Sequence, residues 1–280
     1  MIIVGVDGSA PSRAAVEWAA DDAARMNLPL RIVHVMDTSW YLVGRRPDAA
    51  LPDALLNEGR RILREAEELA RSRQPSVEIT TQEVDGAPAE VLREQAEGAA
   101  ELVVGSRGRG GFAGALLGSV STDVAGQTRC PVVVVRDEPR QEHGEIVAGV
   151  DDSPECEPAL AYAFEQARQR GATLRVVHAW QLPSLALDPE AVYDMDEVRT
   201  AQHQVVRDRL QSLTRDHPQV KVIEDVRSAH PVDALNRVAE QADLLVVGSR
   251  GHGAVRSALL GSVSRGVLHH AGCPVAVVRA

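Results

Sequence analysis

The sequence predicts an α/β protein of two tandem repeats, each a five-stranded parallel open sheet with helices on both faces. Two observations predict this fold. Apolar runs typical of buried strands alternate along the chain with segments of helical periodicity, a pattern typical of parallel sheets. In addition, Gly-Ser-Arg-Gly at 105–108 recurs at 248–251, and in both places nine residues separate it from a Gly-Ser pair. The chain therefore contains the same loop twice.

The two copies define the expected domains. The opening segment 2–9 resembles 146–153, and Cys130-Pro131 recurs as Cys273-Pro274, so the repeat is 143 to 144 residues long. Between the copies lies a polar stretch rich in turn-forming residues. We predict one domain over residues 1–136, a linker over 137–144 and a second domain over 145–280.

The first half of each repeat is expected to run strand, helix, strand, helix. In the first repeat, residues 2–6 form an apolar run typical of a buried strand, and 30–35 form another. Residues 38–52 mix polarities and contain Gly and Pro, which favours a loop. The helix before the second strand covers 11–26, with Ala15, Ala19, Ala23 and Met26 on its inner face. The helix after the loop has an apolar stripe of Leu55, Ile62, Ala66 and Leu69.

The second half of the repeat completes the sheet. Residues 77–84 alternate in polarity, as in a half-exposed edge strand. Pro88 suits the first turn of a helix. A strand over 102–104, a helix over 118–128 and a last strand over 132–135 follow. The second repeat has the same order of elements.

The composition limits the classes of partner and compartment. A formal net charge of −10 argues against duplex nucleic acid, because binding to its phosphate backbone requires a basic face. The three cysteines include no Cys-x-x-Cys pair, which fits a reducing compartment. The chain begins in a strand without a signal peptide, and no apolar run has membrane-spanning length. We therefore expect a cytoplasmic protein that binds neither nucleic acid nor membrane.

Two segments with binding chemistry are expected to meet in each repeat. Asp7 follows the first strand and Gly105 ends the fourth. Ligands of open parallel sheets bind beyond the carboxyl ends of the strands, so these residues share one crevice if their strands are neighbours. Glycines allow close backbone approach, and amides at the following helix start can bind phosphate oxygens. A carboxylate suits ribose hydroxyls or an adenine amine. Asp151 and Gly248 predict a second such site, and a nucleotide is the expected ligand.

These residues resemble those of tandem universal stress proteins of the ATP-binding type. The family signature is Gly-x2-Gly-x9-Gly-Ser/Thr after the fourth strand, with an aspartate ending the first strand, and both repeats carry it. The resemblance covers nearly all of both repeats. It implies a Rossmann-like fold similar to that of the adenine nucleotide alpha hydrolases. It also implies ATP as the ligand, with Mg²⁺ carried by the nucleotide, and a role in the stress response.

The resemblance further implies which residues bind the nucleotide. In the first repeat, adenine and ribose would contact Asp7 and the backbone of Val35, and Gly105 would contact ribose and phosphates. The remaining phosphate contacts would be Gly108, Gly118, Ser119 and Ser121. The second site would consist of Asp151, Ala179, Gly248, Gly251, Gly261, Ser262 and Ser264.

The second copy departs from the first beside its aspartate. Asp152 stands where the first copy has Gly8. A further carboxylate next to a nucleotide would weaken binding through charge repulsion. We therefore predict unequal affinities, with the second site the weaker.

The same residues also have purely structural interpretations. The glycine loops could be tight turns, and Asp7 and Asp151 could be only helix-capping or turn residues. His34 and His178 occupy equivalent strand positions that are typical of core histidines. The loop arginines, which could approach phosphates or face solvent, are Arg107, Arg109 and Arg250. No His, Cys and carboxylate set has metal-ligand spacing, so we expect no metal held by the protein alone.

Three functions are compatible with these observations. Lys221 is the only lysine, so neither loop supplies the lysine of Walker-type phosphoryl transfer. No nucleophile, base and orienting acid can be assembled, and no catalytic residue is predicted. The leading hypothesis is a regulatory ATP-binding protein, in which occupancy orders the loops and changes a surface recognised by an unidentified protein partner. The alternatives are a slow ATP hydrolase or phosphotransferase and a scaffold that needs no nucleotide.

The last strand of each repeat bears on assembly. Residues 132–135 and 275–278 are apolar throughout, and an apolar edge strand favours a partner strand. By analogy with the dimers of single-domain relatives, we expect the two strands to pair within the chain. The sequence is also compatible with a homodimer of the whole chain but does not predict one.

Overall fold

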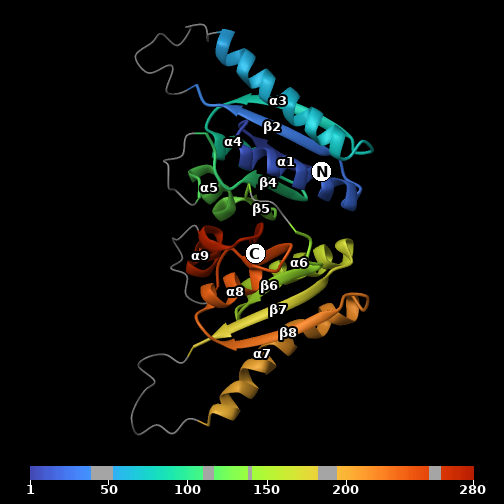
Figure 1. Cartoon of the computed structure of the whole chain (residues 1–280). Helices are drawn as coiled ribbons and strands as arrows, with labels where there is room; N and C mark the ends of the chain where they lie inside the picture. Colours follow the sequence, from blue (N-terminus) through green and yellow to red (C-terminus); the bar gives the residue numbers. More distant parts are fainter. Residues whose placement is uncertain (39–52, 110–116, 138–140, 182–193, 252–259) are drawn as a thin grey trace. The chain divides into compact units, whose positions relative to one another are not determined.

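The computed structural model describes residues 1–38, 53–109, 117–137, 141–181, 194–251 and 260–280 (Figure 1). The chain divides into two compact units, Met1–Pro139 and Arg140–Ala280. The division falls inside the stretch 137–144 that the sequence predicts as a linker. Among the described residues, no helix is both long and apolar enough to cross a membrane.

The first unit is a parallel sheet of five strands. Its strand order is β3-β2-β1-β4-β5, and all four neighbouring pairs are parallel. The bounds are β1 Ile2–Val6, β2 Leu30–Met36, β3 Ile79–Asp85, β4 Glu101–Gly105 and β5 Val132–Val135. The predicted fold class and the neighbouring positions of β1 and β4 are thus confirmed. The edge strand β3 begins at Ile79 rather than at residue 77, and its side chains are half-buried or exposed, as its alternation predicts.

Four described helices accompany this sheet on its two faces (Figure 1). They are α1 Ala10–Met26, α3 Asp53–Arg73, α4 Pro88–Gln95 and α5 Ser119–Gln127. A β-carbon built on Gly5 would meet Leu92 of α4, whereas one built on Gly105 would meet the start of α1. Gly5 pairs with Val104, the residue before Gly105, and successive residues face opposite sides of a strand. Helices α1 and α4 therefore lie on opposite faces.

The two long helices of this unit bury most of the predicted faces, with two corrections. Met26, predicted on the inner face of α1, is only half-buried because it lies in the last turn of the helix. In α1, Ala15, Ala19 and Ala23 are fully buried, and Asn27 ends the helix in the left-handed conformation, with φ 52°. In α3, the buried face contains Ile62, Leu63, Ala66 and Ala70, whereas Leu69 is only half-buried. The side chain of Leu55 and residues 39–52 lie outside the described part of the chain.

The second unit repeats this order. Its sheet runs β10-β9-β6-β7-β8, again with parallel neighbours. The strands are β6 Glu145–Val150, β7 Thr173–Trp180, β8 Val222–Ser228, β9 Leu244–Gly248 and β10 Val275–Val278. The helices are α6 Glu157–Arg170, α7 Met195–Asp216, α8 Pro231–Ala239 and α9 Ser262–His270. The predicted pairing of β5 with β10 stays a prediction.

One local difference separates the starts of the two units. Ser9 caps α1 by accepting a hydrogen bond from the Ser12 amide, whereas a 3₁₀ turn, Pro154–Cys156, precedes α6 without a side-chain cap. Cys156 stands in the place of Ser12, and its thiol donates to the carbonyl of Asp151 at 3.4 Å. The segment between β6 and α6 therefore has a different conformation from the segment between β1 and α1.

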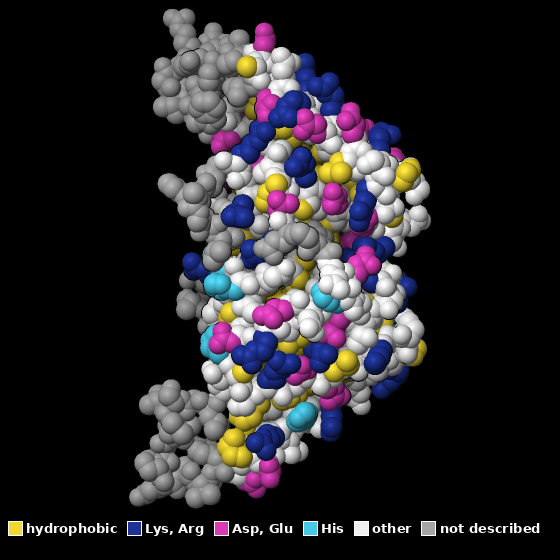
Figure 2. All heavy atoms as spheres, viewed as in Figure 1, with side chains coloured by type: hydrophobic (Ala, Val, Ile, Leu, Met, Phe, Trp, Pro, Cys, Tyr) yellow, Lys and Arg dark blue, Asp and Glu magenta, His cyan; other side chains and the backbone are white. Residues whose placement is uncertain are grey.

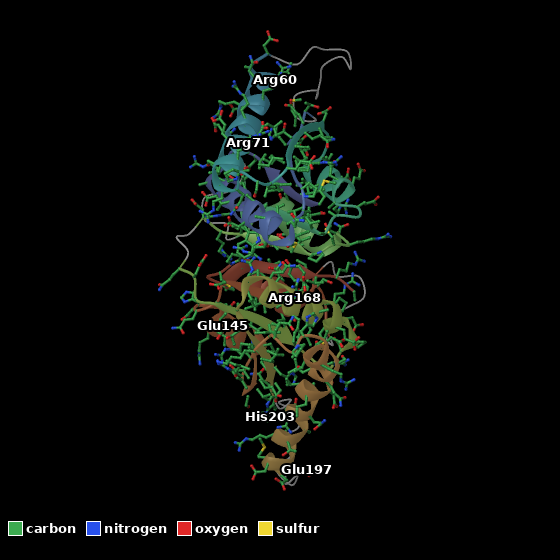
Figure 3. All side chains as sticks on the ribbon, turned by 90° about the vertical axis from the view of Figure 1, so that its right-hand side faces the viewer. Arg60, Arg71, Glu145, Arg168, Glu197 and His203 are labelled. Atoms are coloured by element: carbon green, nitrogen blue, oxygen red, sulfur yellow. The ribbon has the colours of Figure 1, made fainter. Side chains whose placement is uncertain are left out.

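Ion pairs also join neighbouring strands of the second unit. Arg175 of β7 donates to Glu145 of β6 at 2.7 Å and to Asp225 of β8 at 3.3 Å (Glu145 is labelled in Figure 3).

On the face of the molecule shown in Figure 2, basic and acidic side chains are mixed, and neither charge forms a large patch of its own.

Candidate functional site

Asp7 is held at the point where β1 passes into α1. Its Oδ1 accepts hydrogen bonds from the amide of Ser9 at 3.0 Å and from the hydroxyl of Ser9 at 2.6 Å. The same hydroxyl oxygen caps α1 by accepting from the amide of Ser12 at 3.3 Å. The carboxylate is therefore both a turn residue, as one alternative proposes, and a group fixed at the carboxyl end of the strand.

The glycine loop after β4 closes against this carboxylate. The Arg109 amide donates to Asp7 Oδ2 at 2.9 Å, and a β-carbon on Gly108 would come within 2.5 Å of the same oxygen. Real β-carbons essentially never make contacts this short. The predicted meeting of Asp7 with the glycine loop is found, and any side chain at Gly108 would have to displace the Asp7 carboxylate.

Gly105 has a different reason for being glycine. A β-carbon there would lie 2.7 Å from the carbonyl carbon of Pro11 and 2.8 Å from the amide nitrogen of Ser12. The first turn of α1 therefore packs directly on the end of β4. This contact brings the α1 start and the glycine loop together without any ligand.

The start of α5 offers amides to an anion. Gly118 is the N-cap residue and makes no side-chain cap, so the first-turn amides lack helical acceptors. Ser119 is exposed, but Ser121 is buried and its hydroxyl donates to the carbonyl oxygens of Ser106 and Gly118, each at 3.1 Å. Ser119 can therefore donate to a phosphate, whereas the Ser121 hydroxyl proton stabilises the loop. Val35, the remaining predicted residue, is half-buried one position before the end of β2.

In the second unit the corresponding loops surround a cavity of about 720 Å³. It lies at the carboxyl ends of β6, β7 and β9, as expected for an open parallel sheet. Its volume is in the range of small-molecule sites. All seven residues predicted for the second site line it, namely Asp151, Ala179, Gly248, Gly251, Gly261, Ser262 and Ser264.

The internal bonds of this site repeat those of the first unit. Asp151 Oδ1 accepts from the Ser153 amide at 3.1 Å and from its hydroxyl at 2.5 Å. The amide of Gly261 donates to the carbonyl of Ser249 at 2.8 Å, as the amide of Gly118 does to Ser106. Ser264 is buried and donates to the same Ser249 carbonyl at 3.0 Å. Gly261 caps α9 without a side-chain bond, so the first-turn amides of α9 lack helical acceptors and adjoin the cavity.

Several cavity residues were missed by the sequence analysis. Trp180, 8% exposed, ends β7 and adds an aromatic wall beside Ala179. His178 is a buried residue whose Nδ1 lies 3.0 Å from the Val150 carbonyl and whose Nε2 lies 2.8 Å from Gln202 Oε1. The prediction of a partnered core histidine is confirmed, but its ring also lines the cavity. A tryptophan at the carboxyl end of the predicted strand was the available signal for Trp180, whereas the rotation of α7 that brings in Gln202 has no local signal.

The loop that carries Asp152 also has a positively charged side chain beside it. Arg209 of α7 donates to the backbone carbonyl of Asp152 at 2.6 Å and to the carboxylate of Glu157 at 2.6 Å. A cation therefore lies beside the loop that carries Asp152, and it offsets part of the added negative charge. The predicted weakness of the second site stays a prediction. Arg250 also lines the cavity.

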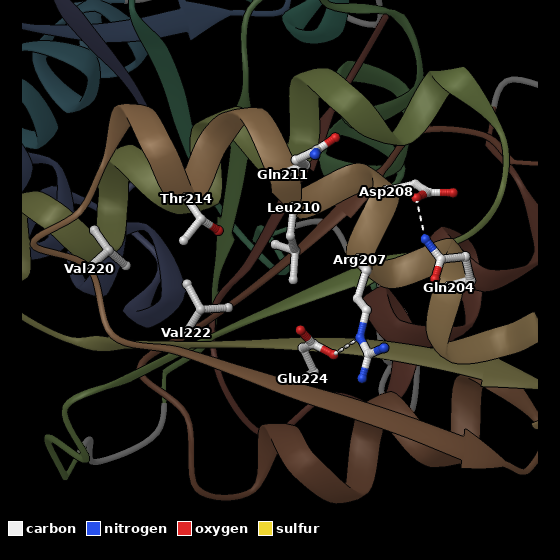
Figure 4. Close-up of a pocket in the computed structure, with 9 residues that line it drawn as sticks. All are labelled: Gln204, Arg207, Asp208, Leu210, Gln211, Thr214, Val220, Val222 and Glu224. Atoms are coloured by element: carbon white, nitrogen blue, oxygen red, sulfur yellow. Dashed lines mark hydrogen bonds and ion pairs between the residues drawn. The ribbon is translucent and has the colours of Figure 1, made fainter. Parts of the chain in front are cut away.

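Another hollow of about 450 Å³ lies between α7 and β8 (Figure 4). It is lined by Leu210 and Val222 together with polar side chains, among them Arg207, which lies 3.7 Å from Glu224. Val222 opens β8, so this hollow is reached from the amino end of that strand and has no glycine loop. It lacks the backbone donors that the larger cavity offers.

Comparison with known proteins agrees with the fold and covers both units. The model of the universal stress protein family matches residues 1–136 and 143–279. A universal stress protein of Mycobacterium tuberculosis is 37% identical over 295 residues, which cover 99% of this chain and 96% of that protein. Another from the same organism is 33% identical over 292 residues, with the same coverage of both chains. The crystal structure of a universal stress protein from Archaeoglobus fulgidus superposes with a TM-score of 0.72 at 21% identity, covering 99% of this chain and 95% of that one.

Proposed function

This chain belongs to the universal stress protein family, and we propose that it is a regulatory protein that binds one adenine nucleotide in each repeat. The observation that carries the proposal is the cavity of about 720 Å³ in the second unit, which all seven residues predicted for that site line. Its walls combine an aromatic ring, a carboxylate and uncapped helix amides. These are the groups that a base, a ribose and phosphates respectively require.

Each part of the ligand has a matching group in the cavity. Trp180 lines the cavity, and its aromatic side chain would supply the apolar surface that an adenine requires. The Asp151 carboxylate, which Ser153 holds at the carboxyl end of β6, suits ribose hydroxyls. The amides at the start of α9 and the hydroxyl of Ser262 suit phosphate oxygens, which the helix dipole also favours.

ATP carried with Mg²⁺ is the proposed form of the ligand. Uncapped amides and a hydroxyl are donors, so they fit phosphate oxygens and not a bare cation. Mg²⁺ bound to a triphosphate keeps several waters and needs few protein ligands. Within the described residues, no three His, Cys, Asp or Glu side chains gather as a metal site. Among the described residues, Asp151 and Asp152 are the carboxylates that line the cavity, so they would be the acidic side chains available to such an ion.

The proposed regulation acts through the loops after β1 and β4, which meet at the site. Asp7 and Arg109 join the loop after β1 to the loop after β4, and a nucleotide between them would replace these internal bonds by bonds to itself. Occupancy would then reorder the loops and alter a surface recognised by a protein partner in the cytoplasm.

The nucleotide content of the purified protein tests the proposal. Freshly purified full chain is denatured, and the released nucleotide is identified by chromatography and counted per chain. About two ATP per chain supports a pair of binding sites, and about one supports unequal sites. Mostly ADP favours hydrolysis. No released nucleotide, together with a flat calorimetric titration with Mg-ATP, overturns the proposal and favours a scaffold.

A further inference from the structure

The first unit contains an ion pair across its candidate site. Arg109 Nη1 donates to Glu58 Oε1 of α3 at 2.5 Å, while the Arg109 amide donates to Asp7 Oδ2 at 2.9 Å. A β-carbon built on Gly8 would lie 3.2 Å from Arg109 Nη2. The guanidinium group thus covers the turn after β1, between the aspartate and α3. The glycine loop is tied to the long helix through this one side chain.

Glu58 is held ready for this contact by its own helix. Arg61, one turn further along α3, donates to Glu58 Oε2 at 2.9 Å and to Oε1 at 2.7 Å. These hydrogen bonds from Arg61, together with the one from Arg109, lower the pKa of the Glu58 carboxyl to about 2. Glu58 is therefore charged at any physiological pH. Arg61 also pairs with Glu65, which does not contact Arg109.

The second repeat has neither residue of this pair in its sequence, and its equivalent of Arg109 lies outside the described residues. Gly59 and Gln202 are equivalent at the repeat spacing of 143, and both lie beside the histidine of the second strand in their unit. The residue before each is Glu58 in the first unit and Ala201 in the second, and Arg109 is replaced by His252. The carboxylate and the arginine are thus both particular to the first repeat.

We propose that Glu58 sets the nucleotide affinity of the first site by competing with the ligand's phosphates for Arg109, an inference that rests on the function proposed above. In the free protein the arginine is bound to α3. When a triphosphate enters, its oxygens offer the guanidinium a bidentate, more highly charged partner, and Arg109 exchanges Glu58 for them. Each binding event at the first site must break the pair, which lowers the affinity of that site alone.

The expected size of the effect follows from the exposure of the pair. The Arg109 and Glu58 side chains are 47% and 38% exposed, so the pair is partly screened by solvent. Exposed ion pairs are weakened by solvent screening, so the change in the dissociation constant should be a few-fold and no more. We expect Glu58→Gln, which keeps the shape and removes the charge, to tighten ATP binding at the first site about threefold to fivefold.

Calorimetric titration of the nucleotide-free full chain with Mg-ATP tests this. The wild type is compared with Glu58→Gln and with the control Glu65→Gln, which removes the other carboxylate partner of Arg61 and leaves Arg109 untouched. One of the two dissociation constants should fall in Glu58→Gln only. A parallel titration with adenosine, which has no phosphates, should give the same constants for all three proteins.

Each contrary result has its own meaning. Unchanged ATP constants in Glu58→Gln overturn the inference and leave the proposed function standing. An equal gain for adenosine also overturns it, because the effect would then not act through the phosphates. The same conclusion follows if Glu65→Gln tightens binding as much as Glu58→Gln. Absence of binding in all three proteins overturns the proposed function and the inference with it.

Discussion

Gly251 lies so close to Asp151 that a β-carbon built on it would come within 2.2 Å of Asp151 Oδ2. In the first unit the same relation holds between Gly108 and Asp7, at 2.5 Å. The second glycine of each motif thus packs against a carboxylate about 100 residues earlier in the sequence. The second glycine of the family signature therefore has a packing role against the aspartate, in addition to any role in binding phosphate.

Gly251→Ala should displace the Asp151 carboxylate and weaken nucleotide binding in the second repeat by about tenfold, because a lost hydrogen bond to a charged group costs about 1.5 kcal/mol or more. Calorimetric titration with Mg-ATP measures the change. Gly272→Ala is the matched control, since a β-carbon there would meet nothing within 4 Å. Equal affinities in Gly251→Ala and the wild type would show that the loop can yield without moving the aspartate.

Gly105→Ala should destabilise the protein more than Gly248→Ala. At Gly105 the new β-carbon would lie 2.7 Å from the Pro11 carbonyl carbon, whereas at Gly248 the nearest atom is the Arg250 carbonyl oxygen at 3.1 Å. We expect a loss of about 1–3 kcal/mol for the first variant and less than about 1 kcal/mol for the second. Calorimetric unfolding of the ligand-free variants measures both. Similar losses would mean that α1 can shift away from β4.

Tryptophan fluorescence should report the second site. Trp180 lines the cavity, so nucleotide binding should change its emission. In a Trp40→Phe background, which removes the tryptophan outside the described residues, Trp180→Phe should abolish the change. Trp18→Phe is the control, because Trp18 is buried in α1, away from the loops, and this variant should keep the signal. A change that survives in Trp180→Phe would remove the ring from the proposed base-binding wall.

Arg73→Ala should destabilise the first unit in a pH-dependent way. Arg73 of α3 donates to both carboxylate oxygens of Asp21 on α1, at 3.0 and 2.9 Å, and Gln74 adds a bond at 2.8 Å. Burial alone would raise the pKa of Asp21, but the bonds from Arg73 and Gln74 outweigh it and lower the pKa. A lowered folded-state pKa means that the stabilisation is present above the unfolded value, near pH 4, and is lost as the pH falls further.

The loss of unfolding free energy in Arg73→Ala should therefore be about 1 kcal/mol at pH 7 and should shrink progressively below about pH 4. Urea titrations across this range measure it. Arg71→Ala provides the comparison, since Arg71 pairs with Glu67 of its own helix and its side chain is 63% exposed (Arg71 is labelled in Figure 3). That variant should be near neutral. A pH-independent loss in Arg73→Ala would exclude Asp21 as the source.

The cysteines should react slowly in the folded protein. All three are buried and none forms a disulfide. Burial, with a smaller contribution from the charge of Glu101, raises the pKa of Cys130 to about 11, and burial also raises the pKa of Cys156. Because the thiolate is the reactive form, alkylation by iodoacetamide near pH 7.5 should be much slower than in urea. Mass spectrometry measures the rate at each site.

Cys156 should be further protected by ATP, because it lines the proposed site, whereas Cys273 should not. Rapid labelling of Cys156 in the folded chain would contradict the burial of its thiol. Labelling unaffected by ATP would count against occupancy of the second cavity.

Most of the fold could be predicted because its signals are local. The runs that became β1 and β5 are apolar throughout, and their predicted bounds match the structure to the residue. The start of β3 was predicted two residues too early, because alternation at 77–84 does not show where pairing with β2 begins. In α3, Leu69 was predicted on the buried stripe and is half-buried, because the rotation of the helix is decided by its packing on the sheet.

The sequence by itself determined the tandem repeat, the parallel sheets and the meeting of Asp7 with the loop of Gly108. Duplicated motifs and the ends of apolar strands can be recognised from residue order alone. Only the tertiary structure decided which side chains complete each site. Trp180 and Gln202 join one cavity through strand register and helix rotation, and Arg109 reaches Glu58 across 51 residues of sequence. Such contacts depend on the direction in which each side chain leaves its backbone, and that direction is decided when the layers pack together.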